Sequence, residues 1–272
     1  MIALGHGLWV KTFAGTLERE MAAALREVLG EQADEAAVAG IGDNAWLTSS
    51  DQVNRLVYAV NEKYTAIISK EAAKAAKQIG VRMDDLGDRP RVRMMMSAKV
   101  NHMARSMAAT SKKRLDDIRD RLASGEITQA QADAEVKQAF GFDTDASTAT
   151  AAGRDRYDNA RANLAAETEG QRAATTGQRL AWRESGIVRE LKWVAVMDGR
   201  TCMFCAQLHG STVPIDEVWF NQDETQIVTD AAGREHRLTY SYDKLDGPPV
   251  HPRCRCKLVP VLVRGTRRRD KR

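Results

Sequence analysis

The chain has 272 residues, of which 43% are hydrophobic and 29% are charged, as in an ordinary globular protein. This length exceeds one average domain and is enough to bury a core, which argues against full disorder. No stretch approaches the roughly 20 uninterrupted apolar residues of a spanning helix, and residues 1–13 lack the basic start and long apolar run of an export signal. We therefore expect a protein that folds in the cytosol and makes no contact with a membrane.

The net charge of +4 is unevenly distributed along the chain. Residues 251–272 carry nine Lys or Arg and one acid, a net charge of +8, whereas the preceding 250 residues carry a net charge of −4. Such a cationic end attracts phosphates or an acidic protein surface, although a solvated tail without a partner is an equally good interpretation. The side chains expected to make these contacts are Arg264, Arg267, Arg268, Arg269 and Lys271.

The first part of the chain shows the apolar spacing of helices. Residues 17–29 predict a short amphipathic helix that ends at Gly30. A longer stripe over 53–79, preceded by a serine cap, predicts a long helix with one buried face. Pro90 makes a continuous helix improbable, so we predict a turn over 82–93 between two long helices.

The next segment predicts a pair of helices joined by a short turn. A stripe rich in methionine runs over 94–122 and indicates an adaptable core. Gly125 is a suitable helix end, and Thr128 with Gln131 forms the capping-box pattern that starts a helix through about Phe140.

The pattern changes in the last third of the chain. An Ala-rich helical run over 154–183 is followed by the alternating pattern of a strand over 191–197. Residues 225–229 and 236–240 flank a turn and predict a hairpin, and 257–263 predict a last strand. The predicted fold class is therefore α+β, in which long N-terminal helices precede a small C-terminal α+β domain with a Cys/His cluster.

We divide the chain into three parts on these grounds. The predicted parts are a helical N-terminal region over 1–150, an α+β domain over 151–263 and a basic tail over 264–272.

All four cysteines fall in the C-terminal domain. Cys202 and Cys205 are two residues apart, on a predicted tight turn, and His251-Pro-Arg-Cys254-Arg-Cys256 supplies three further candidates. Two such groups, far apart in the chain, are typical of a structural zinc site. Because no secretory signal is present, a metal-bound state is favoured over disulfides, with reduced buried cysteines or a labile disulfide pair as alternatives.

Four ligands suffice for tetrahedral zinc, so one of the five candidates is surplus. We expect Cys254 and Cys256 to point to opposite sides of an extended segment, and we favour Cys256 slightly. The zinc would join the strand before the first cysteine pair to the strand after the second group, and would add folding free energy to a small domain. The favoured ligands are Cys202, Cys205, His251 and one of Cys254 and Cys256.

An ordered set of motifs over about 100 residues, from Arg161 to Pro260, resembles the phage Mu protein F-like family of minor head (head morphogenesis) proteins. The motifs are Gly177-Gln178-Arg179-Leu180, Glu184-Ser185-Gly186-Ile187, Trp193-Val-Ala-Val-Met-Asp198, Arg200-Thr201-Cys202-x-x-Cys205, Leu208-His209-Gly210 and Pro248-Pro249-x-His251-Pro252-x-Cys254-Arg255-Cys256. The residues before Arg161 resemble the family only in being helical and Ala-rich. The hairpin over 225–240 is an insertion relative to the short family pattern.

The resemblance implies a structural minor head protein of a tailed phage rather than an enzyme. Its implied partners are the portal protein, the major capsid or scaffolding protein and, through the basic tail, packaged DNA. It implies a role in head assembly, DNA packaging or DNA delivery. The implied location is the virion, at the capsid interior or portal vertex, and the host cytoplasm during assembly.

Two other functions are alternatives to this one. A metal-dependent nuclease would draw on the histidines and acids of the C-terminal domain, but no Asp-His followed by a strand, an Asn and a helix-borne His is present. A free-standing DNA-binding protein is disfavoured because the first 250 residues are net acidic and no recognition helix stands out. We therefore predict no catalytic residues. The nuclease candidates are His209, His236, His251, Asp198, Asp216 and Asp243.

Overall fold

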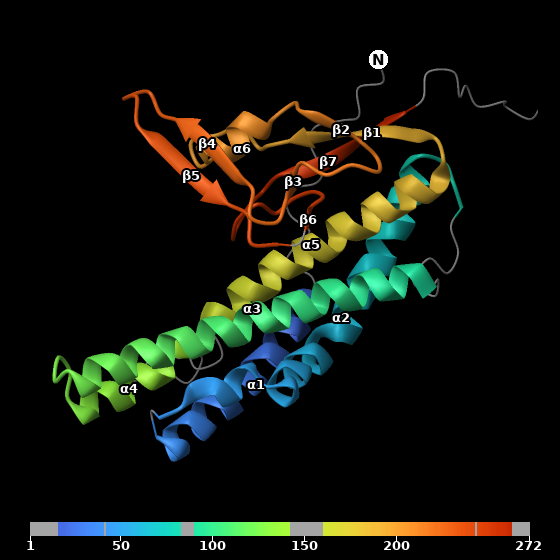
Figure 1. Ribbon diagram of the computed structural model, residues 1–272. Coiled ribbons are helices and arrows are strands. Elements are labelled where there is room, and N and C mark those ends of the chain that lie inside the picture. The colour runs from blue at the N-terminus through green and yellow to red at the C-terminus, as the bar shows by residue number, and fades with distance from the viewer. Residues whose placement is uncertain (1–15, 41, 83–89, 142–159, 243, 263–272) are drawn as a thin grey trace, which may run out of the picture. The chain divides into compact units, whose positions relative to one another are not determined.

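A computed structural model describes residues 16–40, 42–82, 90–141, 160–242 and 244–262. It confirms the predicted fold class, because long helices come first and short strands follow (Figure 1). The described residues form two compact units. Those within 1–64 and 94–169 make up the helical unit, and those within 65–93 and 170–272 make up the mixed unit. Among the described residues, none of the helices combines the length and apolar character needed to cross a membrane.

The helical unit is built from long α-helices and one short 3-10 helix. The helices that lie wholly or partly in it are α1 (Thr16–Ala39), η1 (Asn44–Thr48), α2 (Ser50–Gln78), α3 (Pro90–Ala123), α4 (Gln129–Ala139) and α5 (Ala160–Ser185). Apolar side chains along one face of each long helix are fully buried, among them Leu25, Leu56 and Leu115. This periodic burial is the reason that the helices could be predicted from their spacing.

The helix boundaries differ from the prediction in two places. The α1 helix continues through Gly30 to Ala39, so the predicted end at Gly30 is wrong. A glycine inside a helix costs about 1 kcal/mol, and the burial of Ala33 and Ala36 in the following turns outweighs it. The α3 helix begins at Pro90 itself, because proline fits the first helical turn, where its missing N–H is not needed.

The predicted pair of helices α3 and α4 is confirmed. The Thr128 side chain accepts a hydrogen bond from the backbone N–H of Gln131 at 3.3 Å. The Gln131 side chain in turn accepts one from the backbone N–H of Thr128 at 2.8 Å. Both bonds of the capping box are therefore formed at the start of α4.

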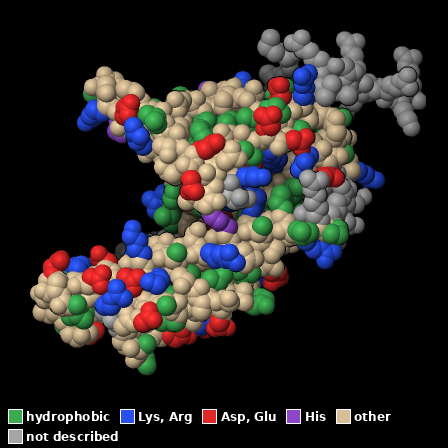
Figure 2. Space-filling view, viewed as in Figure 1, with side chains coloured by type: hydrophobic (Ala, Val, Ile, Leu, Met, Phe, Trp, Pro, Cys, Tyr) green, Lys and Arg blue, Asp and Glu red, His purple; other side chains and the backbone are tan. Residues whose placement is uncertain are grey.

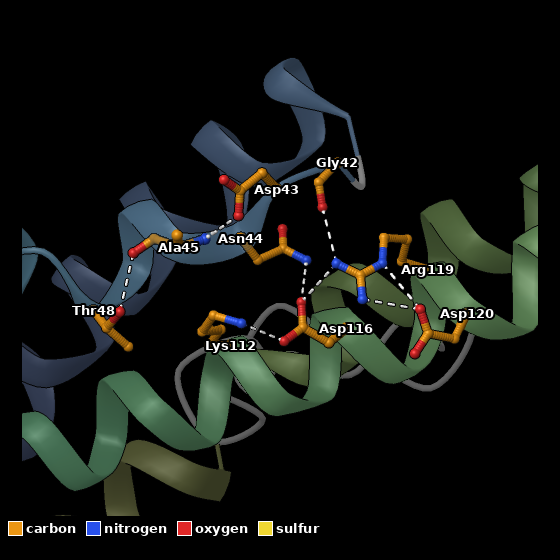
Figure 3. Close-up of polar contacts among 9 residues, drawn as sticks. All are labelled: Gly42, Asp43, Asn44, Ala45, Thr48, Lys112, Asp116, Arg119 and Asp120. Carbon is orange, nitrogen blue, oxygen red and sulfur yellow. Dashed lines mark hydrogen bonds and ion pairs between the residues drawn. The ribbon is translucent and has the colours of Figure 1, made fainter.

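A polar cluster joins η1 to α3 inside the helical unit (Figure 3). The buried Asn44 side chain donates to Asp116 Oδ1 at 3.1 Å, and Lys112 Nζ donates to Asp116 Oδ2 at 2.5 Å. The hydrogen bond from Lys112, followed by that from Asn44, lowers the pKa of Asp116. The cluster fixes where the 3-10 helix lies along α3. Its residues are polar, so the spacing of apolar residues in the sequence could not reveal it.

The surface of the helices carries charges of both signs. On the face shown in Figure 2, acidic and basic side chains are interspersed. Arg121, for example, pairs with Glu126 at 3.1 Å and with Glu135 at 2.7 Å. Exposed pairs of this kind contribute little stability, so the helices are held together by their buried faces.

The mixed unit contains the second parts of α2 and α5, the short helix α6 (Met203–Leu208) and seven strands. The strands are β1 (Val188–Val194), β2 (Thr212–Pro214), β3 (Phe220–Asn221), β4 (Thr225–Thr229), β5 (Glu235–Thr239), β6 (Lys244–Leu245) and β7 (Lys257–Leu262). The β1 strand lies between β2 and β7 and is antiparallel to both (Figure 1). The predicted hairpin is formed by β4 and β5, and the predicted last strand is β7.

The β1 strand is displaced from the predicted range 191–197 toward the N-terminus, and it ends at Val194. The alternating pattern continues beyond Val194, but the chain then enters a turn over 198–201. In this turn the Asp198 N–H donates to Thr201 Oγ1 at 2.9 Å, and the Thr201 hydroxyl donates to the Val196 carbonyl. These hydrogen bonds replace the sheet pairing. The core of the unit contains Trp182 and Trp193, which are 1% and 0% exposed.

Candidate metal centre

The first pair of cysteines lies at the start of α6. Cys202 is the N-cap of this helix and Cys205 lies in its first turn. The Cys202 sulfur accepts a hydrogen bond from the backbone N–H of Cys205 at 3.3 Å. Both sulfurs contact His251 Nε2, so they lie on the same side of the turn. Sequence reasoning predicted only a tight turn here and missed the helix, which is six residues long and too short for a periodic signal.

The second group lies in the segment just before β7. Pairing of Val194 at the end of β1 with Lys257 at the start of β7 brings this segment beside α6. His251 Nε2 lies 3.0 Å from Cys202 Sγ and 3.3 Å from Cys205 Sγ. The predicted ligands of the two sequence groups, 46 to 49 residues apart, are therefore in direct contact.

All five candidates belong to two overlapping groups. Cys202, Cys205 and His251 form one group, and Cys205, Cys254 and Cys256 form the other; within each group the ligand atoms lie within 4.8 Å of one another. The expectation that the last two cysteines point to opposite sides is wrong, because residues two apart in an extended segment face the same side. Both are buried, and the residue between them is partly exposed.

The distances fit a tetrahedral metal ion. Two sulfur ligands each about 2.3 Å from zinc, at the tetrahedral angle, are about 3.8 Å apart. Cys205 Sγ and Cys254 Sγ are 3.8 Å apart. The His251 nitrogen, which would lie about 3.6 Å from each sulfur in an ideal zinc site, lies 3.0 Å and 3.3 Å from the first two sulfurs. The donor set of thiols and one imidazole is the set that zinc prefers.

The imidazole of His251 is oriented as in metal-bound histidines. Its Nδ1 atom lies 2.8 Å from the Pro252 carbonyl oxygen, which accepts a hydrogen bond when Nδ1 carries the proton. In that tautomer Nε2 has a free lone pair, and this is the atom that faces the two sulfurs. A carbonyl that holds the other ring nitrogen is a common outer partner of a ligating histidine.

Electrostatics also favour a cation at this position. The hydrogen bond from the Cys205 thiol, followed by that from Cys256, lowers the pKa of Cys254. The same contact with Cys254 raises the pKa of Cys205, because a second thiolate beside the first is repelled. A bound divalent cation removes this conflict, since it stabilises several thiolates at once.

One face of α5 holds the segment that carries the second group. Gln171 donates to the Cys256 carbonyl at 2.9 Å. Two turns further along, Arg179 donates to the Asp246 carbonyl at 2.7 Å, to the Ile215 carbonyl at 2.8 Å and to the carbonyl of Glu217. These contacts give Arg179, a residue of the Gly177–Leu180 motif, a structural role that its spacing alone did not indicate.

Between these two residues on α5 lies a second arginine. Arg172 is buried, its guanidinium stands 3.4 Å from the centre of the Tyr242 ring, and it reaches the Pro249 carbonyl at 3.5 Å. The segment that leads to His251, from Asp246 to Pro249, is therefore held by polar side chains of one helix.

The other nuclease candidates are not assembled. His209 accepts a hydrogen bond from the backbone N–H of Ala195 at 3.2 Å, and His236 contacts Asp230 at 2.9 Å. Asp198 and Asp216 form ion pairs with Arg255 and Arg183, respectively. In the described part of the chain, no metal-ligating group joins His209 or His236 to these acids. Asp243 and the basic tail residues Arg264, Arg267, Arg268, Arg269 and Lys271 lie outside the described residues.

The fold and the cluster together define a helical protein with a small α+β unit that is closed by Cys and His side chains. The family model described as phage Mu protein F like protein matches residues 112–259, more than half of the 272 residues. The chain therefore belongs to the phage Mu protein F-like family, a family of phage head morphogenesis proteins. The match begins within α3, well before Arg161, where the resemblance of the motifs begins. No curated protein and no solved structure matches the chain.

Proposed function

We propose that the chain is a structural minor head protein of a tailed phage that associates with the portal and the capsid interior. The observation that carries the proposal is the family match, which covers the last part of α3, all of α4 and α5, and the strand region through the first half of β7. A structural role requires stable surfaces rather than a reactive centre. The contacts of His209 and His236 are consistent with that role, because each holds a local turn or helix end.

The Cys/His cluster acts in this proposal as a zinc staple of the mixed unit. The proposed ligands are Cys202, Cys205, His251 and Cys254, with Cys256 as an outer thiol. Cys254 takes precedence over Cys256 because its sulfur lies at the tetrahedral spacing from Cys205. Zinc bound there supplies folding free energy by joining α6 to the segment before β7.

The partners proposed for the chain are the portal protein and the major capsid or scaffolding protein. The tail over 264–272 is proposed to meet packaged DNA or an acidic surface by charge attraction alone. A tail of this kind binds phosphates without reading sequence, so its contacts weaken steeply as salt rises.

The test is co-expression with the portal protein encoded by the same genome, followed by affinity purification through the portal. We expect the full-length chain to remain bound through size-exclusion chromatography. Recovery of the chain as a separate species, in the presence of a correctly assembled portal ring, would refute the portal association.

A second assay addresses the nuclease alternative. Purified protein is incubated with plasmid DNA and Mg²⁺ or Mn²⁺, and we expect the plasmid to remain intact. Cleavage that is lost in a folded His209→Ala or His236→Ala variant would replace the structural role by an enzymatic one, because neither residue belongs to the proposed zinc site.

A further inference from the structure

We propose that the ion pair between Asp198 and Arg255 positions the metal ligands, holding the two ligand-bearing segments at the spacing that the metal requires. The inference rests on the proposed zinc site and adds to it two residues that are not ligands. Neither residue was selected for this role by sequence reasoning, in which Asp198 was only a nuclease candidate.

Arg255 lies on the outer side of the segment that carries the second group. The buried side chains of Cys254 and Cys256 point inward, and Arg255 between them points outward with 30% of its side chain exposed. Its guanidinium donates to both oxygens of Asp198, from Nη1 to Oδ2 at 2.7 Å and from Nη2 to Oδ1 at 2.5 Å. A two-pronged contact of this kind fixes the orientation of both partners as well as their distance.

Asp198 is itself held rigidly beside the first pair of cysteines. Its Oδ1 accepts a hydrogen bond from the backbone N–H of Arg200 at 2.9 Å, and its carbonyl accepts one from the Thr201 N–H at 3.0 Å. The turn formed by these bonds leads directly into Cys202, the N-cap of α6. The position of the Asp198 carboxylate therefore constrains the position of Cys202, the first proposed ligand.

The ion pair supplies a restraint that the sheet cannot supply. Pairing of β1 with β7 stops at Val194 and Lys257, so the chain from Val194 to Cys202 leaves the sheet before the ligands are reached. The contact between Asp198 and Arg255 joins residues 57 apart in sequence, beyond that last pair. It keeps the segments together in the metal-free protein, and so reduces the ordering that metal binding has to complete.

The charge state of the pair suits this role. The hydrogen bond from Arg255, followed by that from the Arg200 N–H, holds the pKa of Asp198 far below its usual range. The carboxylate is therefore ionised at every pH at which zinc can compete with protons for the thiols.

The mixed unit contains a matched control pair. Arg183 Nε lies 2.7 Å from Asp216 Oδ1, and both side chains are substantially exposed. Neither residue belongs to a segment that carries a ligand candidate. Asp216→Asn therefore removes an exposed ion pair of the same type without acting on the proposed zinc site.

The experiment measures the zinc affinity of the full chain by competition with a chromophoric chelator. The variants are Asp198→Asn, Arg255→Gln, the double variant and Asp216→Asn. Asparagine keeps the Oδ1 acceptor of the turn, and Arg255→Lys is a second choice if Arg255→Gln does not fold. We expect each single variant of the pair to bind zinc about 10-fold more weakly, the lower end of the effect of outer partners. The double variant should be no weaker than the weaker single variant, because both changes remove one contact.

Cobalt provides a readout that a general loss of stability would not reproduce. We expect Co²⁺ to give the same tetrahedral absorption band in all variants at saturation, with more Co²⁺ needed to saturate Asp198→Asn and Arg255→Gln. Unchanged zinc affinity in these two variants, an equal loss in Asp216→Asn, or multiplying effects in the double variant would overturn the positioning role while leaving the zinc site in place. A wild-type chain that binds neither metal would overturn the zinc site and this inference together.

Discussion

Gly177 of α5 lies against the backbone of α2, so closely that a Cβ atom at position 177 would stand 2.3 Å from the carbonyl oxygen of Ile68. Alanine is normally more favourable than glycine inside a helix, by about 1 kcal/mol. At position 177 alanine should instead be less favourable than glycine, because the added methyl meets main-chain atoms that move only if a whole helix moves. This close approach belongs to the mixed unit and gives Gly177, the first residue of one family-like motif, a physical role.

We therefore predict that Gly177→Ala lowers the free energy of unfolding by about 1–3 kcal/mol, the usual cost of overpacking. Urea unfolding followed by tryptophan fluorescence measures it, since Trp182 and Trp193 are buried in the same unit. Gly42→Ala is the control, because a Cβ there meets nothing within 4 Å and should change stability little. A Gly177→Ala protein as stable as the wild type would show that the helices are not in contact at this point.

Removal of the metal should destabilise the mixed unit. Zinc present at a thousand times its dissociation constant adds about 4 kcal/mol to the free energy of unfolding. We expect a strong chelator to lower the melting temperature of the wild-type chain and to leave Cys205→Ser unmoved, because Cys205 belongs to both groups of ligand candidates. Elemental analysis of protein purified without chelator should find one zinc per wild-type chain. Equal shifts in the two proteins on chelation would contradict the staple.

The two neighbouring cysteines should differ in their effect on zinc binding. The Cys254 sulfur lies 3.8 Å from that of Cys205, and Cys256 is the surplus thiol of the proposed set. Cys254→Ser should weaken zinc binding by at least about 100-fold, whereas Cys256→Ser, the loss of an outer group, should weaken it by at most about 10-fold. Chelator competition on the two variants decides the question, and the reverse order would assign the ligand to Cys256.

The β4–β5 hairpin should lose its turn in acid. The His236 ring and then the Arg234 N–H, among other partners, lower the pKa of Asp230 from 3.8 to about 2. A carboxyl whose pKa is lower in the folded state adds stability above its unfolded pKa and loses it as the pH falls through the folded pKa. The turn should therefore be intact above about pH 4 and should open between about pH 4 and pH 2.

Nuclear magnetic resonance detects this transition through the amide shifts of residues 230–236, with the purified chain titrated in stages. Asp230→Asn keeps the acceptor oxygen but cannot titrate, so its hairpin shifts should stay constant over this range. If the shifts of both proteins move with the same midpoint, the turn responds to some other group.

Most of the fold was open to prediction because its signals are local. The stripe of α2, the capping box at Thr128 and the paired runs of β4 and β5 each follow from residues within a few positions of one another. The errors occur where tertiary packing overrides a local rule. Burial beyond Gly30 keeps α1 helical, and hydrogen bonds in the turn after Val196 end β1 early.

The ligand candidates were predictable from spacing, and their surroundings were not. Cysteine and histidine at characteristic intervals indicate a metal site. Nothing in a single sequence shows that Arg255 pairs with Asp198 or that Gln171 donates to the Cys256 carbonyl. Such partners depend on the register between β1 and β7 and on the placement of α5, which are properties of the folded chain. The same is true of Asn44, whose partner Asp116 lies 72 residues away.

The contacts of Arg179 have a consequence for how this part of the molecule can diverge. The guanidinium donates to three main-chain carbonyls, those of Ile215, Glu217 and Asp246, and the Asp246 carboxylate also acts on its charge. Every amino acid presents the same carbonyl, so substitutions at Ile215 and Glu217 should leave these hydrogen bonds with Arg179 in place. A single arginine on a helix can thus hold two loops in place mainly through main-chain contacts, which depend little on the side chains of those loops.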